Sequence, residues 1–352
     1  MIGYFVYNLN SYSGASQQAL LLAKYVNENI LIFNHEKNIK KNLYTINNKI
    51  KVIDLPTNKL YRFITIVKYI IRYKIRILHL HGFFAHGLYI AFLLNIKVIL
   101  KSTLLGSDDF DSIKKRKLWF INKLFLKKIH KNIALSNKIK EINSKYINPI
   151  KIEIIPNGVE LPSIVINKKE NIFCFVGLIC DRKGTYESIQ YYIYNYSKLE
   201  HSKMYIIGPN TYRDGLNEFD VEYVKKCYEL VASNKLENQI IFTGHLKKEQ
   251  VFDYFKISKA LIFLSKKEGM PNVVLEAMSH NCISITYSLD GVMEEIYDKC
   301  SVMKEMILKR NDFKINIEIL NSILEKKAPF LQVYNHFNIE NIAKKYKDFY
   351  EF

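Results

Sequence analysis

The sequence predicts two doubly wound, Rossmann-like α/β domains that face each other across a central cleft. Three observations support this fold class. Short apolar runs of β type alternate with amphipathic helical stretches along the whole chain, as in α/β architectures. Most of these runs lack polar alternation, which is expected of parallel strands buried on both faces. The chain has 352 residues, enough for roughly two domains of about 150 residues each.

The expected strands form two series with helices between them. The first series comprises Ile2–Tyr7, Ile30–Phe33, Ile50–Ile53, Ile75–Leu80, Lys97–Lys101, Asn132–Leu135 and Ile152–Ile155. The second comprises Ile172–Val176, Lys203–Ile207, Ile240–Phe242, Ala260–Leu264 and Cys282–Thr286. Helical patterns include Gln17–Asn27, Tyr61–Tyr73, Lys114–Lys131 and Gln250–Ile257.

These series define the expected domains. We predict an N-terminal domain over residues 1–161, a linker over 162–171 that contains Pro, Ser and charged residues, and a C-terminal domain over 172–335. A terminal amphipathic helix over 336–352 could pack back on the N-terminal domain.

The positive charge is concentrated in the first half of the chain. The whole chain has 52 basic and 34 acidic residues, for a formal net charge of +18. Residues 1–160 alone contain 26 basic and 9 acidic residues, for a net charge of +17. Such a balance predicts an anionic partner for the N-terminal domain: nucleic acid, a membrane surface or a phosphorylated substrate. No recognised nucleic-acid-binding motif accompanies the charge.

Two basic amphipathic stretches, Tyr61–Lys74 and Lys114–Lys131, suit an anionic membrane surface. They equally fit sheet-flanking helices whose lysines face outward. The longest apolar stretch, Phe83–Leu100, is interrupted by polar residues and falls short of the ~20 residues of a spanning helix. The five cysteines include no CxxC pair, which favours reduced thiols, and the N-terminus lacks the pattern of a signal peptide. We therefore expect a cytoplasmic protein whose membrane contact is peripheral.

The strongest chemical signal is the segment Ser265–Met278, SKKEGMPNVVLEAM, in which Glu268 and Glu276 are eight positions apart. Its glycine and proline enforce a turn after an apolar strand, with Asn272 as the expected N-cap of a helix that starts near Val273. The N-terminus of such a helix attracts phosphate. A carboxylate one turn further in can accept hydrogen bonds from ribose hydroxyls.

A second signal is the basic pair Arg182 and Lys183, between a strand that ends at Gly177 and a helix that follows Gly184. Ligands of open α/β sheets bind at the carboxyl ends of the strands. Two cations at that edge can hold a diphosphate and stabilise its charge as it leaves. The alternative is an ordinary solvated loop.

In order along the chain, several segments resemble those of glycosyltransferase family 4, which comprises retaining GT-B enzymes that use nucleotide-sugar donors. They are Ser11–Gln18, Ile77–Gly82, Ile154–Glu160, Phe175–Gly184, Ile206–Pro209, Ile241–Leu246 and Ser265–Met278. The resemblance covers essentially the whole chain, and it implies the GT-B fold.

The resemblance also implies the site residues. The implied donor-binding residues are Gly14, Gly177, Arg182, Lys183, His245, Leu246, Glu268, Gly269, Met270, Pro271, Asn272, Val273 and Glu276. Among them, Glu268, Lys183 and Arg182 are the implied catalytic residues. Glu268 would orient the donor sugar and Glu276 would hold the ribose. Two departures from the family pattern stand out: Leu178 replaces the usual arginine, whose role passes to Arg182, and Ala15 replaces a second glycine.

On the acceptor side, the candidates are His79, His81, Asp108 and Asp109. We expect the two histidines to point to opposite faces of their strand, which would exclude a shared metal site. Either they line the acceptor cleft or they are core histidines. The sequence Asp109-Phe-Asp111 has the form of a metal-binding D-x-D motif but lies in an unexpected place, before a basic helix. No metal and no cofactor are expected.

The resemblance implies transfer of a hexose or N-acetylhexosamine from a nucleotide-sugar, expected to be a UDP-sugar. The acceptor would be a glycan or lipid-linked glycan in bacterial surface polysaccharide biosynthesis, such as capsule or lipopolysaccharide. We expect the basic N-terminal domain to bind the inner face of the cytoplasmic membrane, where the enzyme would reach this acceptor. Two alternatives remain at this point: another GT-B enzyme, such as a nucleotide-sugar epimerase, and a non-enzymatic basic protein that binds nucleic acid.

Overall fold

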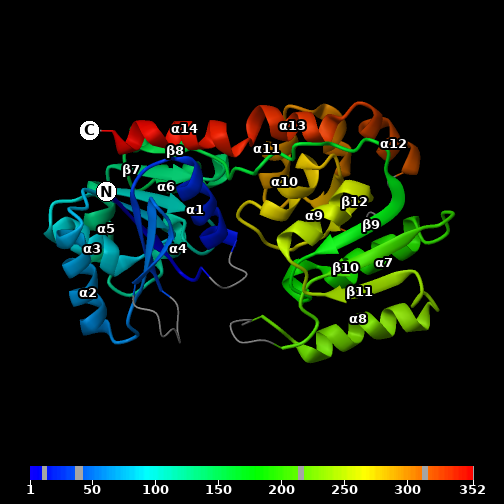
Figure 1. Cartoon of the computed structure of the whole chain (residues 1–352), viewed down its shortest axis with the longest axis horizontal. Helices are drawn as coiled ribbons and strands as arrows, with labels where there is room; N and C mark the ends of the chain where they lie inside the picture. The colour runs from blue at the N-terminus through cyan, green and yellow to red at the C-terminus, as the bar shows by residue number, and fades with distance from the viewer. Residues whose placement is uncertain (10–13, 36–42, 213–217, 311–315, 352) are drawn as a thin grey trace. The chain divides into compact units, whose positions relative to one another are not determined.

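The computed structural model describes residues 1–9, 14–35, 43–212, 218–310 and 316–351. The chain forms two compact units (Figure 1), one of Met1–Gly158 with Ile339–Phe352 and the other of Val159–Asn338. The boundary falls at residue 158, and the terminal helix belongs to the first unit. Part of the expected linker is strand, because β9 begins at Glu170.

The first unit is built on an eight-stranded sheet in the order β3-β4-β2-β1-β5-β6-β7-β8. Its strands are β1 Ile2–Val6, β2 Ile30–Asn34, β3 Leu43–Asn47, β4 Ile50–Asp54, β5 Ile77–His81, β6 Lys97–Ser102, β7 Lys131–Ala134 and β8 Ile152–Ile154. All neighbours pair in parallel except β3 and β4. The apolar runs β1, β2 and β5 are buried along their whole length, as the sequence predicts.

The helices of this unit lie between its strands along the chain, except α14, which follows the second unit. They are α1 Gly14–Tyr25, α2 Lys59–Arg72, α3 Ala85–Leu93, α4 Phe110–Lys114, α5 Trp119–Lys128, α6 Asn137–Ser144 and α14 Ile339–Tyr350, with a short 3₁₀ turn at Pro149–Lys151.

The second unit contains a six-stranded sheet in the order β11-β10-β9-β12-β13-β14, and every strand pair in it is parallel. The strands are β9 Glu170–Val176, β10 Lys203–Ile207, β11 Ile240–Gly244, β12 Ser258–Phe263, β13 Ile283–Tyr287 and β14 Ile307–Leu308. The helices are α7 Thr185–Asn195, α8 Val221–Ser233, α9 Lys248–Ile257, α10 Asn272–Ser279, α11 Val292–Tyr297, α12 Ile317–Glu325 and α13 Ala328–His336, with 3₁₀ turns at Asp181–Lys183 and Ser301–Met306. The predicted fold class, two doubly wound α/β domains, is confirmed.

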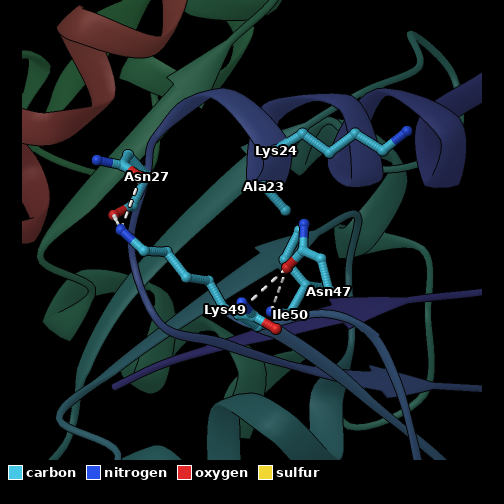
Figure 2. Close-up of a pocket in the computed structure, with 7 residues that line it drawn as sticks. Ala23, Lys24, Asn27, Asn47, Lys49 and Ile50 are labelled. Atoms are coloured by element: carbon cyan, nitrogen blue, oxygen red, sulfur yellow. Dashed lines mark hydrogen bonds between the residues drawn. The ribbon is translucent and has the colours of Figure 1, made fainter.

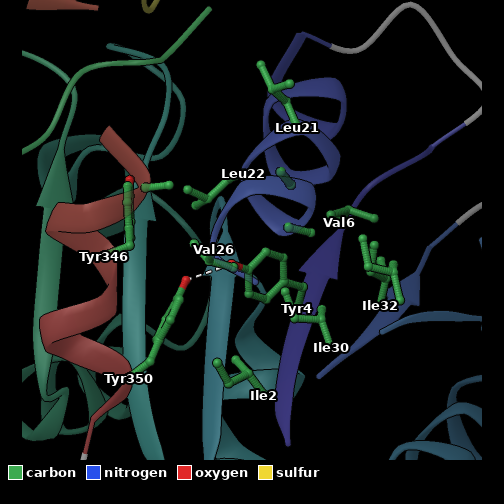
Figure 3. Close-up of a cluster of buried hydrophobic side chains, with 14 of the residues drawn as sticks. Ile2, Tyr4, Val6, Leu21, Leu22, Val26, Ile30, Ile32, Tyr346 and Tyr350 are labelled. Carbon is green, nitrogen blue, oxygen red and sulfur yellow. Dashed lines mark hydrogen bonds between the residues drawn. The ribbon is translucent and has the colours of Figure 1, made fainter. Parts of the chain in front are cut away.

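The core of the first unit includes the last helix of the chain. Figure 3 shows Tyr346 and Tyr350 of α14 beside the apolar side chains of β1 and α1. The Tyr350 hydroxyl lies 2.7 Å from the Tyr4 hydroxyl and 2.7 Å from Nδ1 of His79. Buried hydroxyl and imidazole groups are costly to leave unpaired, so these contacts fix the position of α14 on the sheet.

The prediction of one helix over Lys114–Lys131 is wrong. Helix α4 ends at Lys114, and α5 begins at Trp119 after Leu118 adopts a left-handed conformation with φ of 63°. This reversal packs the Trp119 ring edge-on against Tyr146, with centroids 5.4 Å apart, and leaves Leu118 exposed. The regular spacing of apolar residues concealed the break.

Strand β3 was not predicted. It pairs antiparallel with β4, and four of its five residues are exposed while the fifth is half-buried. An exposed edge strand needs no continuous apolar run, so the pattern used to find the other strands is absent here.

Candidate active site

The two motif loops of the second unit meet at one edge of its sheet. Strands β9 and β12 are parallel neighbours, with Ala260 opposite Phe173 and Leu261 opposite Cys174. Because their carboxyl ends lie side by side, the turn after β9 and the loop after β12 are brought together. The sequence could place each loop at a strand end, and the strand order makes them neighbours.

Gly184 presses the first loop onto the second. It has a left-handed φ of +66°, and a Cβ at this position would lie 1.9 Å from the backbone oxygen of Leu264. Only glycine permits this conformation together with such a close approach. The Lys266 amide then donates to the Arg182 carbonyl at 2.8 Å, and Ser265 Oγ lies 3.1 Å from the same carbonyl.

The Glu268 carboxylate is the centre of this cluster. Its Oε1 accepts from Lys183 Nζ at 2.6 Å, from Arg182 Nη1 at 3.0 Å and from Ser265 Oγ at 3.0 Å. The Glu268 side chain is only 14% exposed, so these charge-assisted bonds are partly shielded from water. Lys183, Arg182 and Glu268, the three residues predicted to be catalytic, therefore lie in direct contact.

The Arg182 guanidinium also faces Glu218, which the sequence did not indicate. Arg182 Nε lies 2.8 Å and 3.0 Å from the two Glu218 oxygens, and Nη2 lies 2.7 Å from Oε2. Burial opposes the charge on Arg182, but its bonds to Glu218 and Glu268 raise its pKa. The hydrogen bonds from Arg182 in turn lower the pKa of Glu218.

Glu276 lies on α10 and pairs with a residue that the sequence did not indicate. Its Oε1 is 3.5 Å from Lys248 Nζ, which is also 3.5 Å from Glu160 Oε2. Burial raises the pKa of Glu276, and the charge of Lys248 opposes that rise. Lys248 is the first residue of α9 and follows β11 closely; this position at a strand end was the signal that could have found it.

Other predicted donor residues lie on turns of the second unit. Gly177 follows β9, and a Cβ on Gly208 would lie 1.7 Å from its oxygen, so two strand ends approach closely there. His245 and Leu246 connect β11 to α9. The segment Gly269–Val273 leads into α10.

The expected N-cap of α10 is wrong. Pro271 occupies that position in an extended conformation (φ −74°, ψ 108°), as an N-cap residue does, and Asn272 is the first helical residue. Gly14 opens α1 in the first unit, and residues 11–13 of the same predicted loop lie outside the described residues.

The acceptor-side histidines are core residues. The side chains of His79 and His81 lie on the same face of β5, with ring centroids 4.0 Å apart, so the expectation of opposite faces is wrong; residues two apart on a strand share a face. Both rings are buried, and burial lowers the pKa of each well below its usual value. Lys101 is buried nearby, donates to Asn157 Oδ1 at 3.0 Å, and has its pKa lowered by burial to about 7.

Asp108 and Asp109 stabilise their own loop. Asp108 accepts from the amides of Thr103 and Leu104 at 2.7 to 2.9 Å. Asp109 caps α4 by accepting from the Ser112 amide at 2.9 Å. The carboxylate of Asp111, the other acid of the D-x-D sequence, bonds the Tyr146 hydroxyl. Among the residues that the structure describes, no group of three or more His, Cys, Asp or Glu side chains is placed to hold a metal ion.

The surface of the described residues is hollowed at several places, of which two bear on the site. One of about 290 Å³ lies at the end of α1 beside the β3–β4 turn; Figure 2 shows Lys49 there, bonded to Asn27 at 2.7 Å. Because it lies at the amino end of β4, it is away from the edge where α/β sheets bind ligands. The other, of about 630 Å³, adjoins Ser265 and Lys266 and extends to Arg310.

The fold has clear relatives among solved structures. Sucrose-phosphate synthase from Thermosynechococcus elongatus superposes with a TM-score of 0.77 at 14% identity, covering 99% of this chain and 98% of that one. Anabaena HepE in complex with UDP and glucose gives a TM-score of 0.68 at 13% identity, covering 99% of both chains. At these identities the likeness concerns the fold, which is that of the GT-B glycosyltransferases.

The family follows from the sequence profiles. Residues 34–162 match the profile described as Glycosyltransferase Family 4, and residues 159–331 match that of Glycosyl transferases group 1. The chain belongs to glycosyltransferase family 4, as the order of its motifs predicts.

The chain is also similar in sequence to bacterial proteins named as glycosyltransferases. The chain is 27% identical over 249 residues to the UDP-Gal:alpha-D-GlcNAc-diphosphoundecaprenol alpha-1,3-galactosyltransferase of Escherichia coli, which covers 62% of this chain and 59% of that enzyme. It is 26% identical over 263 residues to the capsular polysaccharide biosynthesis glycosyltransferase CapH of Staphylococcus aureus, which covers 71% of this chain and 69% of CapH. The chain thus matches less than two thirds of the galactosyltransferase.

No helix among the described residues is long and apolar enough to cross a membrane.

Proposed function

We propose that this protein is a retaining, metal-independent glycosyltransferase. It transfers a hexose or N-acetylhexosamine from a UDP-sugar to a lipid-linked or oligosaccharide acceptor in bacterial surface polysaccharide biosynthesis. The observation that carries the proposal is the contact of Lys183 and Arg182 with Glu268 at the sheet edge. The names of the galactosyltransferase and CapH support the acceptor class, and the UDP complex of HepE supports the nucleotide.

The chemistry assigned to each residue follows from its charge. Lys183 holds the donor diphosphate and stabilises the charge that develops on it as the sugar bond breaks. Glu268 accepts hydrogen bonds from the sugar hydroxyls and orients the ring. Glu276 accepts from the ribose hydroxyls. The acceptor attacks from the face that the diphosphate leaves, so the anomeric configuration is retained, and the departing diphosphate takes the acceptor proton. Positive side chains take the place of a metal at the leaving group.

Calorimetry with nucleotides tests the donor assignment. Wild-type protein should bind UDP more tightly than GDP or ADP in buffer that contains EDTA. Glu276→Ala should weaken UDP binding by ~1–3 kcal/mol, because a charged acceptor for hydroxyls is lost. Glu229→Ala, which removes an exposed carboxylate of α8, is the matched control. Binding of no nucleotide by the wild type would overturn the proposal, and unchanged UDP affinity in Glu276→Ala would remove Glu276 from the ribose role.

Product analysis tests the reaction itself. NMR of the product formed from a UDP-sugar with α configuration and an undecaprenyl-diphosphate sugar acceptor should show an α linkage. A β linkage would contradict retention.

We further propose that the protein works at the inner face of the cytoplasmic membrane. The relevant surface consists of α2, α3 and α5 of the first unit, which lie together in Figure 1. Their exposed large apolar side chains are Leu60, Tyr61, Phe63, Ile64, Ile71, Phe92, Leu93, Phe120, Ile121 and Leu124. Residues 55–107 and 112–140 contain no Asp or Glu, so every lysine and arginine of these three helices is carried without an acidic residue on the same helix. Such a surface fits anionic headgroups and the boundary of their acyl chains.

Vesicle co-sedimentation tests this location. Lys114, Lys115, Arg116 and Lys117 lie at the end of α4 and in its connection to α5, directly before that surface. Replacing them with alanine removes four exposed charges at about 1 kcal/mol each, or roughly a thousandfold in partitioning. The variant should leave anionic vesicles while UDP binding is unchanged, and salt should weaken wild-type binding. If the variant pellets like the wild type at low salt, the anchor is α2 instead. If neither pellets, the membrane location is wrong.

A further inference from the structure

The ion pair between Arg182 and Glu218 has a geometry that matters for the donor site. Glu218 offers both carboxylate oxygens to Nε and Nη2 of Arg182 at 2.7 to 3.0 Å. This is the two-pronged arrangement in which a guanidinium also binds phosphate. Glu218 thus holds the face of Arg182 that a diphosphate would use.

The remaining donors of Arg182 are also engaged. Its Nη1 donates to the Lys267 carbonyl and to Glu268 Oε1, both at 3.0 Å. A guanidinium has five N–H groups, and those of Nε and Nη1 are taken, with one of the two on Nη2. A bidentate phosphate can therefore reach Arg182 only where Glu218 now lies. Lys183 differs, because its ammonium has three N–H groups and its carboxylate partner among the described residues is Glu268 alone.

The pair with Glu218 is suited to reversible exchange. The Arg182 side chain is 35% exposed and that of Glu218 is 48% exposed, so solvent screens their attraction. The contact to Glu268 is more protected, since Glu268 is 14% exposed. Glu218 belongs to the segment that precedes the α8 cap Asp220 and not to the sheet edge that carries Arg182. Arg182 can therefore exchange its exposed partner Glu218 while it keeps its protected contact with Glu268.

We propose that Glu218 is an internal stand-in for the donor diphosphate: it holds the Arg182 guanidinium in place while the site is empty and is displaced when the diphosphate binds. This inference rests on the proposed donor site. It makes Glu218 a positioning residue that competes with the ligand. Leu178 stands where the family usually has an arginine. Arg182 is therefore the arginine that must bind the diphosphate, and Glu218 keeps its guanidinium in position for that role.

Isothermal calorimetry on the full chain tests the competition. Glu218→Gln keeps the shape of the side chain and removes its charge, so it should bind UDP and inorganic pyrophosphate more tightly than the wild type. An exposed ion pair contributes up to about 1 kcal/mol, so the expected gain is roughly two- to fivefold. Uridine, which lacks the diphosphate, should bind equally to both proteins. Glu222→Gln, an exposed residue in the first turn of α8, makes the same change in net charge and should give no gain.

The Arg182→Gln substitution identifies the cation involved. In an Arg182→Gln background, Glu218→Gln should no longer increase affinity for pyrophosphate. Equal or weaker binding of UDP and pyrophosphate by Glu218→Gln would overturn the inference and make Glu218 a scaffold for Arg182. A gain shared by Glu222→Gln would overturn it too, as an effect of net charge. Failure of the donor proposal looks different: neither protein would bind UDP, while pyrophosphate would still report on Glu218.

Discussion

Replacement of Gly184 by alanine tests how closely the two motif loops approach. The left-handed conformation of this residue, with φ of +66°, costs an L-amino acid about 1–2 kcal/mol. The new Cβ would lie 1.9 Å from the Leu264 oxygen, so the backbone must move, at a further cost of about 1–3 kcal/mol. The sum of about 2–5 kcal/mol corresponds to a fall in Tm of roughly 4–20 °C for a unit of this size.

A second glycine separates the two contributions. Gly291 also has a left-handed φ, +91°, but a Cβ there would have nothing within 4 Å. Gly291→Ala should therefore lose only about 1–2 kcal/mol, and the effect of alanine on the unfolded chain is the same at both positions. Differential scanning calorimetry of the two variants measures the difference, and UDP titration shows whether the moved loop still binds. Equal losses of stability would refute the close approach of Gly184 to Leu264.

Three further outcomes are expected. Lys183→Ala should lower the kcat for UDP release from the UDP-sugar that the wild type uses by ~10² or more, while Lys266→Ala, at a neighbouring lysine that pairs with Asp181 and Glu187, should not; a rise in KM alone would make Lys183 a ground-state binder. Tyr350→Phe loses two buried hydrogen bonds of its hydroxyl and should reduce the free energy of unfolding by ~1–3 kcal/mol in a denaturant titration, with UDP affinity unchanged. Burial already raises the pKa of Glu276, and Lys248→Met should raise it further, so UDP affinity should begin to fall at a higher pH than in the wild type as the pH is lowered; identical pH profiles would contradict this coupling.

The sequence predicted elements well where burial is continuous. The strand Ile2–Val6, for example, is buried along its whole length, and its unbroken apolar run is enough to predict it. It failed where the backbone departs from its pattern: at Leu118, whose left-handed conformation splits a regular amphipathic run, and at β3, an exposed edge strand. The apolar or polar character of a segment can be read from its sequence, whereas the left-handed conformation of one residue such as Leu118 cannot.

The site was predictable in its motif residues and not in their partners. Lys183 and Glu268 stand at the ends of strands that the sequence reveals, so their meeting follows once β9 and β12 are neighbours. Glu218 and Lys248 belong to no motif, and their roles depend on the direction in which exposed side chains turn. The error with His79 and His81 was one of geometry, since a pleated strand returns to the same face every second residue.

The order of synthesis has a consequence for the first unit. Its core contains Tyr346 and Tyr350 of α14, which a ribosome adds more than three hundred residues after Tyr4 of β1. The second unit is a continuous stretch, Val159–Asn338, and is complete before α14 has been made. Domains generally fold as units during synthesis, so the part of the chain made second can finish folding first. Until α14 has been synthesised, the apolar side chains of the first unit against which it packs stay uncovered, and in this interval we expect the unit to be most exposed to chaperones and proteases.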